Sequence, residues 1–307
     1  MKFNKLVTSI GLTVGTVLFA SNSAQAADFT SNLSQNTDST KDILLESITQ
    51  KNKQGVMETF REFSYVYEAD IEYNDEYKGG NSGAISTDHG DNVQMEEISR
   101  IEGLNDYSKD HEDNVVDFLG NNNLNKIIDT EDKGTFTLNL FFKDLIKEDK
   151  SGLDSLFFFE RGMNSNLLIQ ALDSDGNTIG DQLFLKGKNK QIDQSFANKL
   201  KDNNIKQKND QKKAGYQINT KEIGGSQQVG SWGVSLAELG VDSLKGVQIY
   251  ASGHKYYQGP DFKVIARQSS YIPDINFSKA AKVPEPGTII GLGSVAALAF
   301  IRRRKSK

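Results

Sequence analysis

The feature that most constrains the fold is a series of short segments in which apolar and polar residues alternate. The clearest is Thr135–Phe142, and two more strands are predicted in Leu156–Glu160 and Asn166–Asp173. Period-two alternation is typical of strands, because successive side chains point to opposite faces of a sheet. The third segment runs into Asp175-Gly176 and then the apolar stretch Thr178–Leu185. Asp-Gly between two apolar runs predicts a β-hairpin.

Further strands are expected along the rest of the chain, with no alternation of strands and helices. They are predicted in Val56–Tyr73, Tyr216–Thr220, Val229–Leu236, Val247–Ser252 and Pro260–Ala266. Nine or ten short strands with turns between them predict an all-β fold, a β-sandwich and most simply a jelly roll. We expect one such domain over residues 27–268, followed by a stalk over residues 269–283.

Four polar stretches interrupt this pattern. We expect an extended start over residues 29–41, irregular loops with one short helix near residues 95–102, and a polar loop over residues 120–134. A Lys-, Asn- and Gln-rich insertion over residues 186–213 is expected to be helical around residues 193–201.

The N-terminus has the pattern of a secretory signal peptide. Two lysines, Lys2 and Lys5, precede a largely apolar run over residues 6–20. A small-x-small cleavage site follows at Ala24-Gln25-Ala26, with cleavage expected before Ala27. Residues 1–26 are therefore excluded from the fold.

The C-terminus has three parts in a fixed order. Pro284, Glu285 and Pro286 come first, and two prolines around one residue hold the backbone extended, as a processing enzyme requires. An uncharged run of 15 residues, 287–301, follows. As a helix it would be about 22 Å long, which is short for a permanent membrane span. A basic tail then ends the run and favours a cytoplasmic end: Arg302, Arg303, Arg304 and Lys305.

This order resembles the PEP-CTERM sorting signal of exported bacterial proteins. The resemblance implies recognition by an exosortase, a membrane transpeptidase-like cysteine enzyme, which removes the tail after transient retention in the inner membrane through residues 287–301. The alternative is an ordinary C-terminal membrane anchor. Several internal segments also resemble a cyanobacterial group of exosortase-dependent surface proteins: Phe157–Asn166, Ile169–Asp173, Gln228–Leu236, Gly259–Val264 and Asn123–Gly134.

Charge and cysteine content agree with an exported protein that does not bind nucleic acid. The chain has 36 basic and 41 acidic residues and no cysteine. Removal of residues 1–26 and 284–307 takes away seven cations and one acid, which leaves 29 basic and 40 acidic residues and a net charge of −11. Such a body would be repelled by nucleic acid and by anionic lipid. Without disulfides, it must be held together by its core or by metal.

Two acidic loop clusters are candidate calcium sites. They could supply oxygen ligands from one end of a sandwich, although solvated acidic loops have the same composition: Asp88, Asp91, Asp129, Glu131 and Asp132. A second candidate loop begins at Asp173, but strands flank it and the Glu expected at its twelfth position is replaced by Phe184. A plain hairpin turn is the simpler interpretation of that loop.

Exposed aromatic residues could form a carbohydrate platform. Tyr250, Tyr256 and Tyr257 are the candidates, with Trp232 as a further member. A second set lies in one predicted strand: Tyr65, Tyr67 and Tyr73. Packing in the core or at an edge is the alternative for all of them, and above all for Trp232.

Catalytic patterns are weak throughout the chain. There is no cysteine nucleophile and no Gly-x-Ser-x-Gly elbow, and none of the three histidines has metal-ligand spacing: His89, His111 and His254. The sequence therefore predicts a non-enzymatic surface or extracellular-matrix protein that uses the secretion machinery and an exosortase. A calcium-dependent carbohydrate-binding module that contacts extracellular polysaccharide is the second hypothesis, and a hydrolase is the third.

Overall fold

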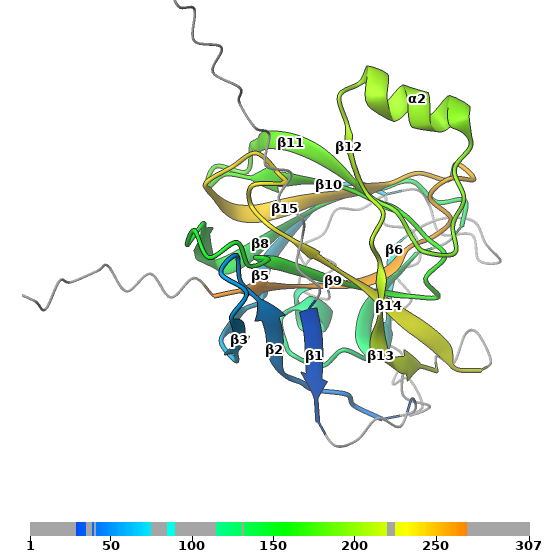
Figure 1. Cartoon of the computed structure of the whole chain (residues 1–307). Coiled ribbons are helices and arrows are strands. Elements are labelled where there is room, and N and C mark those ends of the chain that lie inside the picture. Colours follow the sequence, from blue (N-terminus) through cyan, green and yellow to red (C-terminus); the bar gives the residue numbers. More distant parts are fainter. Residues whose placement is uncertain are drawn as a thin grey trace, which may run out of the picture. The chain divides into compact units, whose positions relative to one another are not determined.

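The computed structural model describes residues 29–34, 39, 41–74, 85–89, 115–130, 132–219 and 225–268, with only the backbone for 85–89. The chain divides into two units, Met1–Ser269 and Ser270–Lys307. All described residues lie in the first unit, which is built of strands with little helix (Figure 1).

Eight strands form the centre of the fold. In chain order they are β7 (Lys126–Thr130), β8 (Phe136–Lys147), β9 (Leu156–Arg161), β10 (Leu167–Leu172), β11 (Thr178–Leu185), β14 (Gln227–Val234), β15 (Ser243–Ala251) and β16 (Asp261–Arg267). β7 pairs with β16, β8 with β15, β9 with β14 and β10 with β11, always antiparallel, so the first strand of this series pairs with the last. A long ribbon rolled up in this way is a jelly roll, so the predicted fold class is confirmed.

Additional strands extend the two sheets of the roll. The six-stranded sheet has the order β12-β11-β10-β15-β8-β5, where β5 is Val66–Asn74 and β12 is Lys206–Lys208. The seven-stranded sheet has the order β13-β14-β9-β16-β7-β6, with β4 paired to β16. Its added strands are β13 (Lys212–Ile218), β6 (Ile85–His89) and β4 (Phe63–Ser64).

The main hydrophobic core joins these two sheets. It contains inward-facing residues of both, and its largest fully buried members are Phe136, Phe142, Phe158, Phe184, Phe262 and Trp232. Trp232 is 1% exposed, and its indole Nε1 donates to the carbonyl of Lys186 at 3.3 Å. The interpretation of Trp232 as a core residue is confirmed.

A third layer covers the outer face of the seven-stranded sheet. It is a small sheet of β1 (Phe29–Leu33), β2 (Leu45–Lys51) and β3 (Met57–Phe60). Phe157 of β9 lies 4.9 Å from Phe29 and 5.6 Å from Phe60, measured between ring centroids. Because both faces of β9 are covered, all six of its residues are buried.

One helix, α2 (Gln194–Asp202), lies in the polar insertion, near its predicted position. Asp193 caps it by accepting a hydrogen bond from the backbone N–H of Phe196 at 2.9 Å. Phe196 packs on Phe184 at 5.5 Å between ring centroids, which attaches α2 to the six-stranded sheet. Within the described residues, no helix is long and apolar enough to cross a membrane.

One segment predicted as an extended start and one predicted as a polar loop contain strands. Residues 29–33 form β1, because Phe29 packs into a second hydrophobic core, between the third layer and the seven-stranded sheet, and the strand pairs with β2. Residues 126–130 form β7, because Ile127 and Ile128 face the two cores on opposite sides of the sheet. The expected helix near residues 95–102 lies outside the described residues.

Candidate functional site

The outer face of the six-stranded sheet carries polar side chains, whereas β1–β3 cover the outer face of the seven-stranded sheet. In the strand register, Gln170 of β10 lies opposite Gln248 of β15, which lies opposite Asn139 of β8. We call these three residues the amide row. Gln248 Nε2 donates to Asn139 Oδ1 at 3.0 Å, and both amides donate to the carboxylate of Glu72 on β5, at 3.2 and 2.6 Å. The carboxylate therefore fixes the orientation of two amides in the row.

A second row runs beside the first, two residues further along each strand. Leu168 lies opposite Tyr250, which lies opposite Thr137, which lies opposite Tyr73. The ring of Tyr250 is half-buried and meets the ring of Tyr257 edge-on at 5.6 Å. An aromatic ring therefore lies directly next to the amide row.

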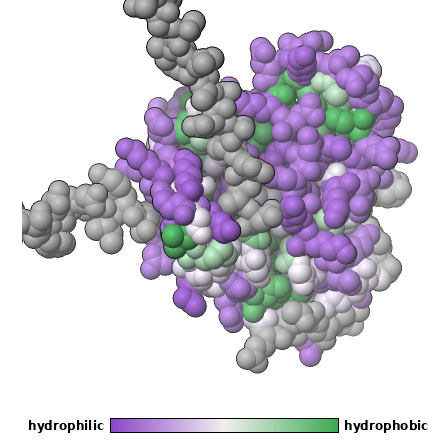
Figure 2. Space-filling model, viewed as in Figure 1, coloured by the Kyte–Doolittle hydropathy of each residue, from purple (hydrophilic) through white to green (hydrophobic). Residues whose placement is uncertain are grey.

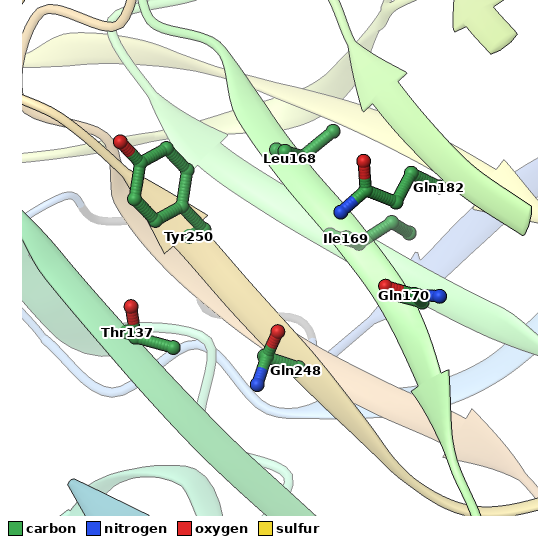
Figure 3. A pocket seen from close by; sticks show the side chains of 7 residues that line it. All are labelled: Thr137, Leu168, Ile169, Gln170, Gln182, Gln248 and Tyr250. Carbon is green, nitrogen blue, oxygen red and sulfur yellow. The ribbon is translucent and has the colours of Figure 1, made fainter. Parts of the chain in front are cut away.

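The two rows border a hollow of about 210 Å³ in the surface. Figure 3 shows the tyrosine ring and the three glutamine amides arranged around this space. Its lining consists of Thr137, Leu168, Ile169, Gln170, Gln182, Gln248 and Tyr250. No lining residue carries a charge. The hollow is therefore suited to an uncharged polar ligand.

A bulge in β11 brings Gln182 to the hollow. The register between β10 and β11 shifts after Ile169, and Gly180 lies in the shifted segment with φ +67°. The carbonyl of Gly180 accepts a hydrogen bond from Gln170 Nε2 at 3.1 Å. A Cβ at this glycine would lie 2.1 Å from the carbonyl oxygen of Leu239, so only glycine fits. The bulge thus links the position of Gln182 to the amide row.

The three tyrosines predicted to form a glycan platform do not lie together on the surface. Tyr256 and Tyr257 are only 8% and 6% exposed. Phe196 of α2 stacks on Tyr256 at 4.2 Å, and Phe184 packs against Tyr257 at 5.7 Å, both between ring centroids. That part of the prediction is wrong, because α2 covers these two rings. Tyr250 borders an open hollow, while Tyr67 and Tyr73 of the second set are exposed, at 45% and 46%.

The predicted calcium ligands are only partly described. Asp129 lies in β7 and Asp132 in the turn after it, whereas Asp91 and Glu131 lie outside the described residues, as does the side chain of Asp88. Among the residues that the structure describes, no three His, Asp or Glu side chains form a group that could hold a metal ion. The calcium site therefore stays a prediction.

The loop at Asp173 is a hairpin turn. One carboxylate oxygen of Asp173 accepts hydrogen bonds from the backbone N–H groups of Asp175 and Asn177, both at 2.9 Å. Gly176 has φ +82°, the left-handed conformation that the turn requires. These hydrogen bonds lower the pKa of Asp173. The interpretation of this loop as a plain hairpin turn is confirmed.

Two deeply buried carboxyl groups were not identified from the sequence. Burial raises the pKa of Asp154 to about 7, and its partner is the amide of Gln50 on β2. Burial also raises the pKa of Glu160 well above its usual range, and Gln211 donates to its Oε2 at 3.0 Å. Both carboxyls are 0% exposed, so neither can reach a substrate in this structure. Their role is therefore structural.

Two buried cations form hydrogen bonds at β16, one to a neighbouring strand and one to a loop. Arg161 of β9 donates to one oxygen of the Asp261 carboxylate, Oδ2, through Nε at 3.1 Å and Nη2 at 2.8 Å. Lys263 is 0% exposed, and its Nζ donates to the carbonyls of Phe118 and Lys126 at 2.7 and 3.3 Å. Burial lowers the pKa of Lys263 well below its usual range. The bonds of Lys263 anchor residues 118–126 to the sandwich.

The residues predicted to direct the protein to its destination lie outside the described part of the chain. They comprise the cleavage-site residues Ala24, Ala26 and Ala27, the triplet Pro284, Glu285 and Pro286, and the basic tail Arg302, Arg303, Arg304 and Lys305. The described surface seen in Figure 2 is mainly hydrophilic, with small separate hydrophobic groups.

Comparison with known proteins identifies the C-terminal stretch. Residues 282–305 match the PEP-CTERM protein-sorting motif. This confirms the resemblance of the C-terminal stretch to that sorting signal, which implies export and processing by an exosortase. The resemblance of internal segments to a cyanobacterial group of surface proteins stays a prediction. No curated protein and no solved structure matches the chain.

Proposed function

We propose that this protein is a non-catalytic component of the cell surface, outer envelope or extracellular matrix. The general secretion machinery exports it, and cleavage of residues 1–26 gives a chain that begins at Ala27. Residues 287–301 then hold it briefly in the inner membrane. An exosortase cuts near Pro284–Pro286 and passes the folded body on. The observation that carries this proposal is the sorting-motif match at residues 282–305.

The absence of catalysis is part of the proposal, and two observations support it. The most perturbed carboxyl groups, Asp154 and Glu160, are sealed inside the sandwich. The hollow beside Tyr250 is lined by amides, hydroxyls and apolar groups; the lining contains no carboxyl, imidazole, amine or thiol, and no base in it activates the Thr137 hydroxyl. The hollow is therefore suited to binding a ligand rather than to catalysis.

The test is replacement of the triplet by Pro284→Ala, Glu285→Ala and Pro286→Ala in the full-length chain. Loss of the cleavage handle should leave the protein in the membrane fraction, with its C-terminal tail still attached. Fractionation and intact mass of the recovered protein measure both effects. The matched control is Pro273→Ala with Asp274→Ala in the stalk, outside the motif, which should not change release. Unchanged release and mass of the triplet variant would refute the proposal.

A carbohydrate-binding role with the same delivery route is the second candidate. The specific observation in its favour is the hollow with its amides and tyrosine, whose lining is uncharged and partly open to solvent.

A further inference from the structure

We propose that the hollow on the outer face of the six-stranded sheet binds an uncharged carbohydrate chain. The binding groups are the amides of Gln170, Gln182 and Gln248, the hydroxyl of Thr137 and the ring of Tyr250. The site would be used outside the cell, so its biological role rests on the proposed export. Binding itself can be measured independently of export.

The hydrogen-bonding groups fit the hydroxyls of a sugar. An amide side chain offers both donors and acceptors, and adjacent hydroxyl groups on a sugar ring require both. Within the described structure, the side chains of Thr137 and Gln182 make no hydrogen bond, and the carbonyl oxygens of Gln170 and Gln248 accept none. These half-buried groups are therefore available to a ligand in place of water.

The amides are also held in place before a ligand arrives. Gln248 is fixed by Asn139 and Glu72, and Gln170 is fixed by the carbonyl of Gly180. Asn139 is itself 2% exposed, which restricts its side chain further. Pre-positioned polar groups reduce the entropy lost on binding, so a shallow site can still be selective.

The tyrosine supplies an apolar surface for the ring face of a sugar. Tyr257 holds Tyr250 at an interplanar angle of 89°, and Leu168 lies opposite Tyr250 across the strand pair. A rigid aromatic ring contributes contact area with little loss of conformational entropy. The amides and the ring lie in adjacent rows, about 7 Å apart along the strands. One sugar can therefore contact both.

Charge and size define the class of ligand. No lysine, arginine or histidine lines the hollow. The amide row is hydrogen-bonded to a negatively charged group, the carboxylate of Glu72. An anionic polysaccharide would be repelled there, because like charges that are not paired raise the free energy of binding. The three glutamines of the lining, Gln182, Gln170 and Gln248, lie on the neighbouring strands β11, β10 and β15, a span of about 10 Å. This is longer than one ring, so a segment of chain fits better than a single sugar.

The test uses the exported protein recovered from culture and two probes, cellohexaose as a neutral chain and polygalacturonate as an anionic one. Isothermal titration should detect binding of cellohexaose or of another neutral hexasaccharide, mannohexaose, and no binding of polygalacturonate. Tyr250→Ala and Gln248→Ala should weaken that binding by at least about tenfold, the effect of losing one to two buried contacts. The half-buried Gln182 makes no hydrogen bond to described residues, so Gln182→Ala should weaken binding severalfold while leaving the fold intact.

Matched controls separate binding from folding. Tyr67→Ala removes a 45% exposed tyrosine of β5, and Gln217→Ala removes an exposed glutamine of β13; both lie outside the hollow and should leave binding unchanged. Melting temperature shows whether each variant is folded. The proposal is overturned if neither neutral hexasaccharide binds, if polygalacturonate binds instead, or if folded Gln182→Ala and Tyr250→Ala variants bind as tightly as the parent protein.

Discussion

The two outer faces of the sandwich show how one architecture can be closed on one side and open on the other. The seven-stranded sheet carries Phe157 and Phe159 outward, and β1–β3 cover them to form a second core. The six-stranded sheet carries Gln170 and Gln248 outward, with a hollow between its rows of side chains. Covered strands must be apolar on both faces, whereas an open face can use its outward positions for binding.

The largest effect is expected on the covered face. Phe157→Ala should lower the free energy of unfolding by about 3–5 kcal/mol, because a 0% exposed ring between two layers leaves a cavity that cannot collapse fully. The control is Tyr67→Ala on the open side, where the ring is 45% exposed and contacts Lys245, and the loss should be under about 1 kcal/mol. Urea denaturation measures both. Equal losses would contradict the difference between the faces.

A smaller effect per pH unit is expected at the junction of the third layer and the sandwich, where Asp154 meets Gln50. Because its folded pKa is raised to about 7, Asp154 keeps its proton where the unfolded chain has lost it. Its contribution is complete below about pH 4 and falls by about 1.4 kcal/mol per pH unit as the pH rises towards 7. Burial raises the pKa of Glu160 as well. Asp154→Asn should therefore make the decrease of the unfolding free energy with pH shallower without abolishing it.

The matched control for this pH dependence is Asp173→Asn. Asp173 is half-buried and hydrogen bonds from the turn lower its pKa, so it contributes stability above its unfolded pKa and loses it as the pH falls. That variant should not flatten the decrease between about pH 4 and about pH 7. Urea midpoints measured across this range decide the outcome. An Asp154→Asn variant with the parent slope would show that the carboxyl is ionised in the fold.

The smallest effect is expected at the bulge that carries Gln182. Gly180→Ala should cost about 2 kcal/mol, because the new Cβ would meet the Leu239 carbonyl oxygen at 2.1 Å and the residue has φ +67°. Gly215→Ala has φ +91° but nothing within 4 Å of the added Cβ, so it should cost only about 1 kcal/mol. Thermal unfolding compares the two. If both variants lose the same stability, the close contact between residue 180 and the Leu239 carbonyl does not constrain the bulge.

The sequence was informative wherever a strand has one covered face. In Thr137–Phe142 and Val247–Tyr250 the alternation of polar and apolar residues indicated strands, and the structure has β8 and β15 there. It was less informative for β1 and β7, whose polar residues favour loops. Those strands form because of distant partners: Phe29 packs on Phe157, and Ile128 pairs with Phe262. Such contacts have no local signal.

The candidate site was predicted only in part for the same reason. Tyr250 was identified as an aromatic residue, but the amides that surround it come from β10, β11 and β15, and only the strand order brings them together. Tyr256 and Tyr257 were assigned to the surface because their cover, α2, lies about 60 residues earlier in the chain. The burial of Asp154 and Glu160 depends on the layers around them, which a one-dimensional pattern does not contain.

The central claim is that both ends of the chain serve delivery and that the folded body works without them. Intact mass and terminal sequencing of the protein recovered from the surface or medium of the producing cells test it most directly. The account predicts a chain that begins at Ala27 and ends near Pro284–Pro286, without the basic tail Arg302–Lys305. Recovery of surface protein that still carries this tail would contradict it.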